Sequence, residues 1–125
     1  MQEGIILPHA PSWAKAVYHL YVVRVQNRDQ LQKHLGEASI GTGIHYPIPL
    51  HLQKAYRNLG YRKGDFPVSE GAAAEALSLP MYPGLGYVQQ ERIVQQVRGF
   101  VCGETSARTS SASSARVASL AVQGG

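Results

Sequence analysis

Two histidines and a tyrosine surround a pair of prolines in segment 42–53: they are His45, Tyr46 and His51. An imidazole can donate or accept a hydrogen bond or carry a positive charge, and a phenol offers a hydroxyl and an aromatic face. Proline fixes φ and favours extended backbone in the residue before it, so this turn is predicted to be stiff. Residue types alone leave two interpretations open: a ligand-binding pair, or a His and a Tyr that close the end of a sheet.

Other residues that could do chemistry exclude several kinds of site. His45 and His51 have no third ligand near them in the sequence, and two histidines are too few for a zinc site. Cys102 is the single cysteine, which excludes an intrachain disulfide, and it has no Cys/His/Asn setting for a nucleophile. Gly84 and Gly86 are too closely spaced to form a phosphate-binding loop. We therefore expect no metal site and no catalytic residue in this chain.

The elements that must position these residues are predicted from hydrophobic periodicity to form an α/β fold. Strands are predicted at 18–25, 41–46 and 77–81, and helices at 28–38, at 50–59, from about residue 67, and at 87–101. The strands would form a small, mostly antiparallel sheet with the helices packed over it. In the second strand, Gly41 and Gly43 indicate a bend or the close approach of another group.

Length and composition limit the chain to one domain. Residues 1–102 are predicted to form that domain, and residues 103–125 are a Ser/Ala-rich tail without aromatic residues that we expect to be disordered. The net charge of +4 is spread over isolated Lys and Arg residues, which argues against a nucleic-acid partner. No apolar run approaches the roughly 20 residues of a membrane span, and the start does not resemble a signal peptide. We expect a cytoplasmic protein.

Three runs of residues together carry a family resemblance. They are TGIHYPIPLHLQ at 42–53, GDFPVSE at 64–70 and LSLPMYP at 77–83. These runs resemble the C-terminal small domain of the DegT/DnrJ/StrS family, pyridoxal-phosphate (PLP) aminotransferases that act on nucleotide-linked sugars. The resemblance covers roughly residues 1–101. It implies the three-stranded, mostly antiparallel sheet covered by helices that type I PLP aminotransferases have in their C-terminal domain.

The resemblance also implies roles for the residues of segment 42–53. His45 would supply a hydrogen bond or partial positive charge to a phosphate or sugar hydroxyl, and Tyr46 a hydroxyl or a stacking face. His51 would line the substrate entrance or cap the start of a helix. All three would bind substrate rather than transfer a proton. The implied partners are the nucleotide-sugar substrate and the aminotransferase large domain or a homodimer partner.

A PLP aminotransferase needs a lysine that forms an imine with the cofactor. The four lysines here are Lys15, Lys33, Lys54 and Lys63. None has the serine-rich, glycine-flanked surroundings that the family gives its cofactor lysine, so we expect no covalently bound PLP. The chain is therefore predicted to be a C-terminal fragment of a sugar aminotransferase that is inactive alone. The alternative is a stand-alone, noncatalytic module that binds a nucleotide sugar or docks onto an aminotransferase subunit.

A small domain without its large domain should expose the apolar surface that normally contacts the large domain. The candidates for this surface are Trp13 and the face formed by Ala72 and Ala73. We therefore expect the chain to associate or to be poorly soluble.

Overall fold

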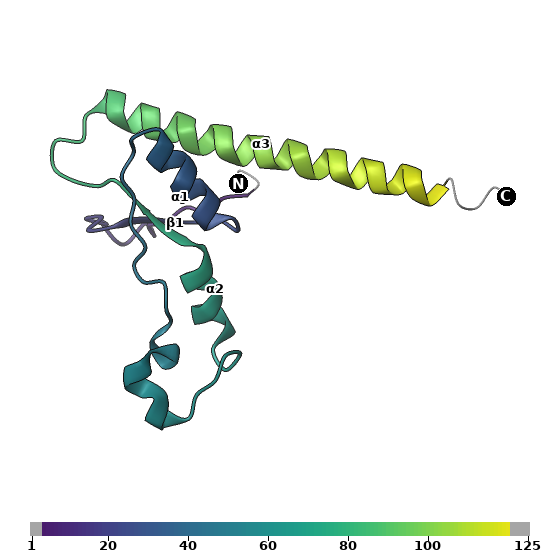
Figure 1. Cartoon of the computed structure of the whole chain (residues 1–125). Helices are drawn as coiled ribbons and strands as arrows, with labels where there is room; N and C mark the ends of the chain where they lie inside the picture. The colour runs from purple at the N-terminus through teal and green to yellow at the C-terminus, as the bar shows by residue number, and fades with distance from the viewer. Residues whose placement is uncertain (1–3, 121–125) are drawn as a thin grey trace.

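The computed structural model describes residues 4–120, and the side chains of residues 4–103. In chain order the elements are β1 (Tyr21–Arg24), α1 (Arg28–Glu37), the 3₁₀ helices η1 (Leu50–Leu52) and η2 (Lys54–Leu59), α2 (Pro67–Glu75), β2 (Ala76–Leu79) and α3 (Tyr87–Leu120) (Figure 1). This mixed α/β architecture is the predicted fold class.

The sheet consists of two antiparallel strands. β1 pairs with β2 from Tyr21 opposite Leu79 to Arg24 opposite Ala76. Two isolated bridges flank this sheet: Ile6 pairs with Arg24 of β1, and Gly43 pairs with Ser78 of β2. The segments around Ile6 and Gly43 each contribute a single paired residue, and neither forms a further strand.

The prediction of a third strand at 41–46 is therefore wrong. The segment makes one bridge, at Gly43, and then leaves the sheet. Glycine weakens strand interiors because it has more backbone freedom to lose, and Pro47 has no N–H with which to continue a ladder. The segment therefore lies beside β2 without extending along it.

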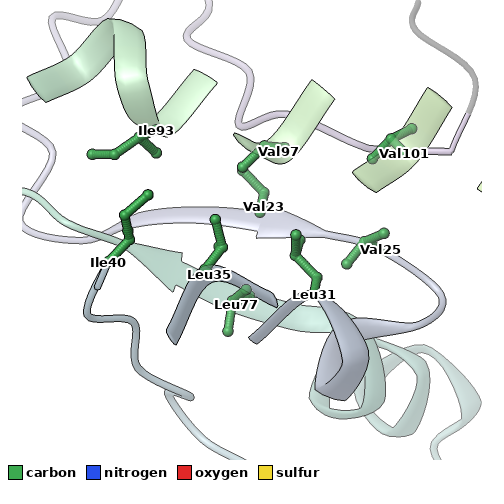
Figure 2. Packing of buried hydrophobic residues seen from close by; sticks show 9 residues of the cluster. All are labelled: Val23, Val25, Leu31, Leu35, Ile40, Leu77, Ile93, Val97 and Val101. Atoms are coloured by element: carbon green, nitrogen blue, oxygen red, sulfur yellow. The ribbon is translucent and has the colours of Figure 1, made fainter. Parts of the chain in front are cut away.

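The core lies where α1 and α3 pack together against the sheet (Figure 2). Its buried residues are Val23, Val25, Leu31, Leu35, Ile40, Leu77, Ile93, Val97 and Val101. The residues of α3 recur every four positions, as do Leu31 and Leu35 of α1, so each helix turns one stripe toward the sheet. The predicted helices at 28–38 and 87–101 correspond to α1 and to the first part of α3.

Between the sheet and α2 the chain forms an excursion, residues 45–66, which we call the arm. The arm extends away from α1 and α3 and carries η1 and η2 at its far end (Figure 1). A single helix was expected at 50–59, but Gln53 adopts extended backbone (ψ 146°) and separates two 3₁₀ helices. Neither contains a buried residue, so no packing surface stabilises a longer α-helix here. The predicted helix end at Gly60 is confirmed by its left-handed backbone, φ 77°.

α3 continues to Leu120, beyond the expected helix end at residue 101 and into the stretch predicted to be disordered. Residues 121–125 of that stretch lie outside the described residues. The division into a domain at 1–102 and a tail at 103–125 stays a prediction. None of the helices within residues 4–120 combines the length and apolar character that crossing a membrane requires.

Candidate functional site

His45 lies beside β2 because the chain pairs with that strand two residues earlier. The Gly43 N–H donates to the Ser78 carbonyl at 3.0 Å, and the Ser78 N–H donates to the Gly43 carbonyl at 2.8 Å. Residues two apart on extended backbone point to the same face, so His45 follows Gly43 onto the side of the Ser78 hydroxyl. Nδ1 of His45 lies 2.9 Å from Oγ of Ser78 and shares a hydrogen bond with it.

Gly43 leaves open the space that the His45 ring fills. A Cβ atom at position 43 would lie 2.7 Å from Cε1 of His45, far inside van der Waals contact. A glycine approached closely by another group was predicted in this segment. At Gly43 that prediction is confirmed, and the approaching group is the imidazole of His45.

Tyr46 lies next to His45 and is 74% exposed. Its ring meets the His45 imidazole edge-on, with centroids 5.7 Å apart and an interplanar angle of 81°. The peptide bond between the two residues is cis. Within residues 4–103, neither Nε2 of His45 nor the Tyr46 hydroxyl has a hydrogen-bond partner. The pair therefore presents a ring nitrogen and a phenol that can both bond to a ligand.

His51 belongs to a second group of side chains, at the junction of the arm and α2. Its Nε2 lies 3.0 Å from Oε1 of Glu70, in the first turn of α2. The same oxygen accepts the Gly64 N–H at 2.7 Å. The His51 ring packs on Phe66, with centroids 4.7 Å apart, and Tyr61 meets Phe66 edge-on. We call His51, Gly64, Phe66 and Glu70 the Glu70 cluster.

The Glu70 cluster favours the ionised form of its carboxyl group. The hydrogen bond from the Gly64 N–H is the largest influence and lowers the pKa of Glu70 below its usual range. Partial burial opposes this effect, because only 16% of the side chain is exposed. The hydrogen bond and charge of His51 and the Phe66 N–H lower the pKa further. The cluster is thus a small hydrogen-bonded contact that joins the arm to α2.

The three predicted substrate-binding residues do not all lie in one group. His45 and Tyr46 are together at the exit from the Gly43 bridge, whereas His51 contacts Glu70 and Phe66. His51 is also largely covered, with 8% of its side chain exposed. Their common role in substrate binding stays a prediction.

Sequence reasoning missed both Ser78 and the contact that Glu70 makes with His51 and Gly64. A signal for Ser78 was present, since it is the one polar residue of β2. At 4% exposed it is buried, and a buried hydroxyl needs a partner. That partner lies 33 residues earlier in the chain, so local patterns could not identify it.

The lysines do not fit a PLP site formed by this chain. All four are exposed, and Lys33 faces Glu37 at 4.0 Å across one turn of α1. None lies in an enclosed polar setting that would hold an imine. Residues 4–103 also contain no cluster of three or more His, Cys, Asp or Glu side chains that could hold a metal ion.

Comparison with known proteins gives a consistent result. A sequence model of the DegT/DnrJ/EryC1/StrS aminotransferase family matches residues 2–98. The chain is 45% identical over 95 residues to the erythromycin biosynthesis sensory transduction protein EryC1 of Saccharopolyspora erythraea, covering 76% of this chain and 26% of that protein. It is 40% identical over 95 residues to the dTDP-3-amino-3,4,6-trideoxy-alpha-D-glucose transaminase of Streptomyces venezuelae, covering 76% and 25%.

Solved structures agree with the sequence matches. The structure of S. venezuelae DesV in complex with a ketimine intermediate superposes with a TM-score of 0.75 at 39% identity, covering 78% of this chain and 26% of that one. An aminotransferase of the same family from Brucella abortus gives a TM-score of 0.71 at 36% identity. The chain spans about a quarter of the length of the relatives it matches.

Proposed function

Because the chain belongs to the DegT/DnrJ/EryC1/StrS aminotransferase family, we propose that it is the C-terminal, small-domain part of an enzyme that aminates nucleotide-linked keto-sugars. Support comes from the names of relatives, which include transaminases of dTDP-linked and UDP-linked sugars. The observation that carries the proposal is the His45–Tyr46 pair, held beside β2 with Nε2 of His45 and the phenol free to bond.

In the complete enzyme, bound PLP would supply the carrier for the amino group and the electron sink. The residues of this chain would act on the substrate instead. Nε2 of His45 would donate to a phosphate or sugar oxygen, and Tyr46 would offer its hydroxyl or its ring face. Nε2 of His51 already bonds Glu70, so His51 would hold the arm against α2. In that position it would also line the substrate entrance.

A chimera tests the proposal directly. Residues 2–98 replace the corresponding quarter of the S. venezuelae transaminase, and formation of the amino sugar is measured. We expect turnover, and we expect His45→Ala in the chimera to lower kcat/KM about tenfold or more, as for loss of a hydrogen bond to a charged group. His9→Ala, in the exposed opening segment, is the matched control. A chimera that folds and binds PLP but forms no amino sugar would contradict the proposal.

The isolated chain is proposed to be inactive as an aminotransferase. The chain is incubated with PLP, treated with borohydride and analysed by intact mass. Labelling of the four lysines should not exceed the level seen with an unrelated protein of similar lysine content. Stoichiometric trapping at any one lysine, together with amino transfer from glutamate to a keto-sugar nucleotide, would refute this part of the proposal.

The exposed apolar residues near the start of the chain favour a second candidate, a noncatalytic module that docks onto an aminotransferase subunit or binds a nucleotide sugar. Trp13 is 86% exposed and Val17 is 91% exposed. Calorimetric titration with dTDP-glucose and UDP-glucose tests the binding form of this candidate. Saturable heat that disappears in His45→Ala would support it, and absence of heat would count against it.

A further inference from the structure

The position of the His45 imidazole depends on two residues in different segments of the chain. Gly43 and Ser78 face each other across the isolated bridge, and both of their backbone N–H groups are bonded in it. The bridge fixes the distance between the backbone at position 43 and the Ser78 side chain. His45, two residues beyond Gly43, can then reach Oγ of Ser78 only by lying across Gly43.

The absence of a side chain at position 43 makes this path possible. A Cβ atom there would lie 2.7 Å from Cε1, 3.4 Å from Nδ1 and 3.5 Å from Nε2 of His45, so the ring lies directly over the glycine. At Gly41, two residues earlier, an added Cβ would meet nothing within 4 Å. Space for the ring is therefore required at position 43 and not at its neighbouring glycine.

Ser78 contacts His45 through its hydroxyl group and adds little to the hydrophobic core. Leu77, its neighbour in β2, is fully buried in the core, so Ser78 points to the opposite face of the strand. Its side chain is buried, and burying a hydroxyl costs free energy unless the hydroxyl is hydrogen-bonded. Nδ1 of His45 supplies that bond at 2.9 Å.

We propose that Ser78 and Gly43 are positioning residues for His45: Ser78 bonds one ring nitrogen, Gly43 leaves room for the ring, and Nε2 is thereby turned outward. This role rests on the proposed function of His45 as a substrate ligand. When the Ser78 hydroxyl donates to Nδ1, the ring proton is on Nε2. His45 then offers an N–H donor, which suits a phosphate or sugar oxygen.

Nuclear magnetic resonance of the full chain tests the positioning itself, without any ligand. In the wild type we expect a nuclear Overhauser effect between Hε1 of His45 and the Hα protons of Gly43, and ¹⁵N shifts that show the Nε2–H tautomer near pH 8. Ser78→Ala should remove the contact between the ring and Gly43, and Ser78→Thr should retain it. Gly43→Ala should displace the ring, whereas Gly41→Ala, the matched control, should leave it in place.

Activity measurements in the chimera separate this proposal from the proposed function. In the chimera, Ser78→Ala should lower kcat/KM about tenfold, as His45→Ala does, and the double variant should be no less active than either single variant. If the ring signatures behave as expected but a chimera that folds and binds PLP forms no amino sugar, the proposed function fails and the positioning stands.

Three results would overturn the positioning proposal. One is a wild-type spectrum in which the His45 ring shows no contact with Gly43. A second is a Ser78→Ala variant, with backbone amide shifts otherwise unchanged, that keeps the wild-type contact. Equal effects of Gly41→Ala and Gly43→Ala would also contradict it, because only the latter meets the ring.

Discussion

At the scale of single residues, Glu70 connects more of the arm than any predicted binding residue does. Its Oε1 atom accepts hydrogen bonds from the loop at Gly64 and from His51 of η1, while its own backbone belongs to α2. Three chain segments thus meet at one carboxylate oxygen. The arm has no buried residue in η1 or η2, so this polar contact is a main restraint on its position.

Acid should therefore weaken the structure through Glu70. Because the pKa of Glu70 is lowered in the folded state, its carboxylate stabilises the fold fully above the ordinary glutamate pKa of about 4.3, and this contribution is lost as pH falls through the lower folded value. We expect the free energy of unfolding of Glu70→Gln to change less than that of the wild type between about pH 6 and about pH 3.

Urea unfolding across that pH range measures this prediction, with the Gly64 amide shift as a local probe of the same ionisation. Glu37→Gln is the control, because Glu37 is exposed and only faces Lys33 at 4.0 Å. A Glu70→Gln variant with the same pH dependence as the wild type would show that the carboxylate does not restrain the fold.

The sequence identified His45 and Tyr46 because an imidazole and a phenol next to prolines are an unusual combination in a packing segment. It could not identify their relation to Ser78. That hydrogen bond depends on a single-residue bridge, and such a bridge has no periodic pattern that a sequence reveals. His51 was grouped with His45 because both lie in a run that resembles the family, yet the chain after Pro47 and Pro49 carries His51 to Glu70 of α2.

At the scale of elements, prediction succeeded where burial imposes a period and failed where it does not. α1 and α3 turn stripes of residues four apart into the core, and both were predicted. The apolar residues of 50–59 have helical spacing too, but η1 and η2 bury none of them. No packing surface therefore stabilises an α-helix in this segment, and local backbone preferences lead to two short 3₁₀ helices instead.

The core between α1 and α3 should dominate stability. Leu35 is fully buried there, so Leu35→Ala is expected to lower the free energy of unfolding by about 2–5 kcal/mol, a large part of the roughly 5–15 kcal/mol of a typical domain. Leu59→Ala removes the same atoms from an exposed site of η2 and should cost less than about 0.5 kcal/mol. Thermal and urea unfolding measure both, and equal costs would contradict this account of the core.

One contact between α1 and α3 is open to improvement. His34 packs on Phe100 with ring centroids 5.6 Å apart, and its Nε2 is buried without a hydrogen-bond partner among the described residues. His34→Leu should raise the free energy of unfolding by about 1 kcal/mol near pH 8, because it removes an unsatisfied buried polar atom. His9→Leu, at an exposed position, is the control. A less stable His34→Leu variant would show that the imidazole contributes more than its packing.

At the scale of the whole molecule, the surface is unusually apolar near the start of the chain. Trp13 and Val17 are almost fully exposed, and Trp13 is one of the predicted candidates for this surface. The face expected at Ala72 and Ala73 is different: Ala73 is buried and Ala72 half-buried, because α2 turns them inward. The apolar surface expected at Trp13 is therefore exposed, whereas the one expected at Ala72 and Ala73 is not.

This surface should drive association of the chain. Burying a side chain such as Val17 contributes about 1.5 kcal/mol, which is roughly tenfold in an association constant. We expect sedimentation to show larger species as concentration rises, together with a blue shift in the fluorescence of Trp13, the single tryptophan. Trp13→Gln with Val17→Gln should weaken association, as followed by sedimentation and by dye binding to apolar surface.

The matched control is Val88→Gln, which replaces an equally exposed valine in the first turn of α3, far along the chain from Trp13. If association is a property of the opening segment, Val88→Gln leaves it unchanged. If both variants weaken it alike, the contact is a general consequence of exposed apolar area and no particular surface is responsible. A chain that remains monomeric at every concentration and binds no dye would contradict the exposed-surface account, and with it the docking form of the second candidate function.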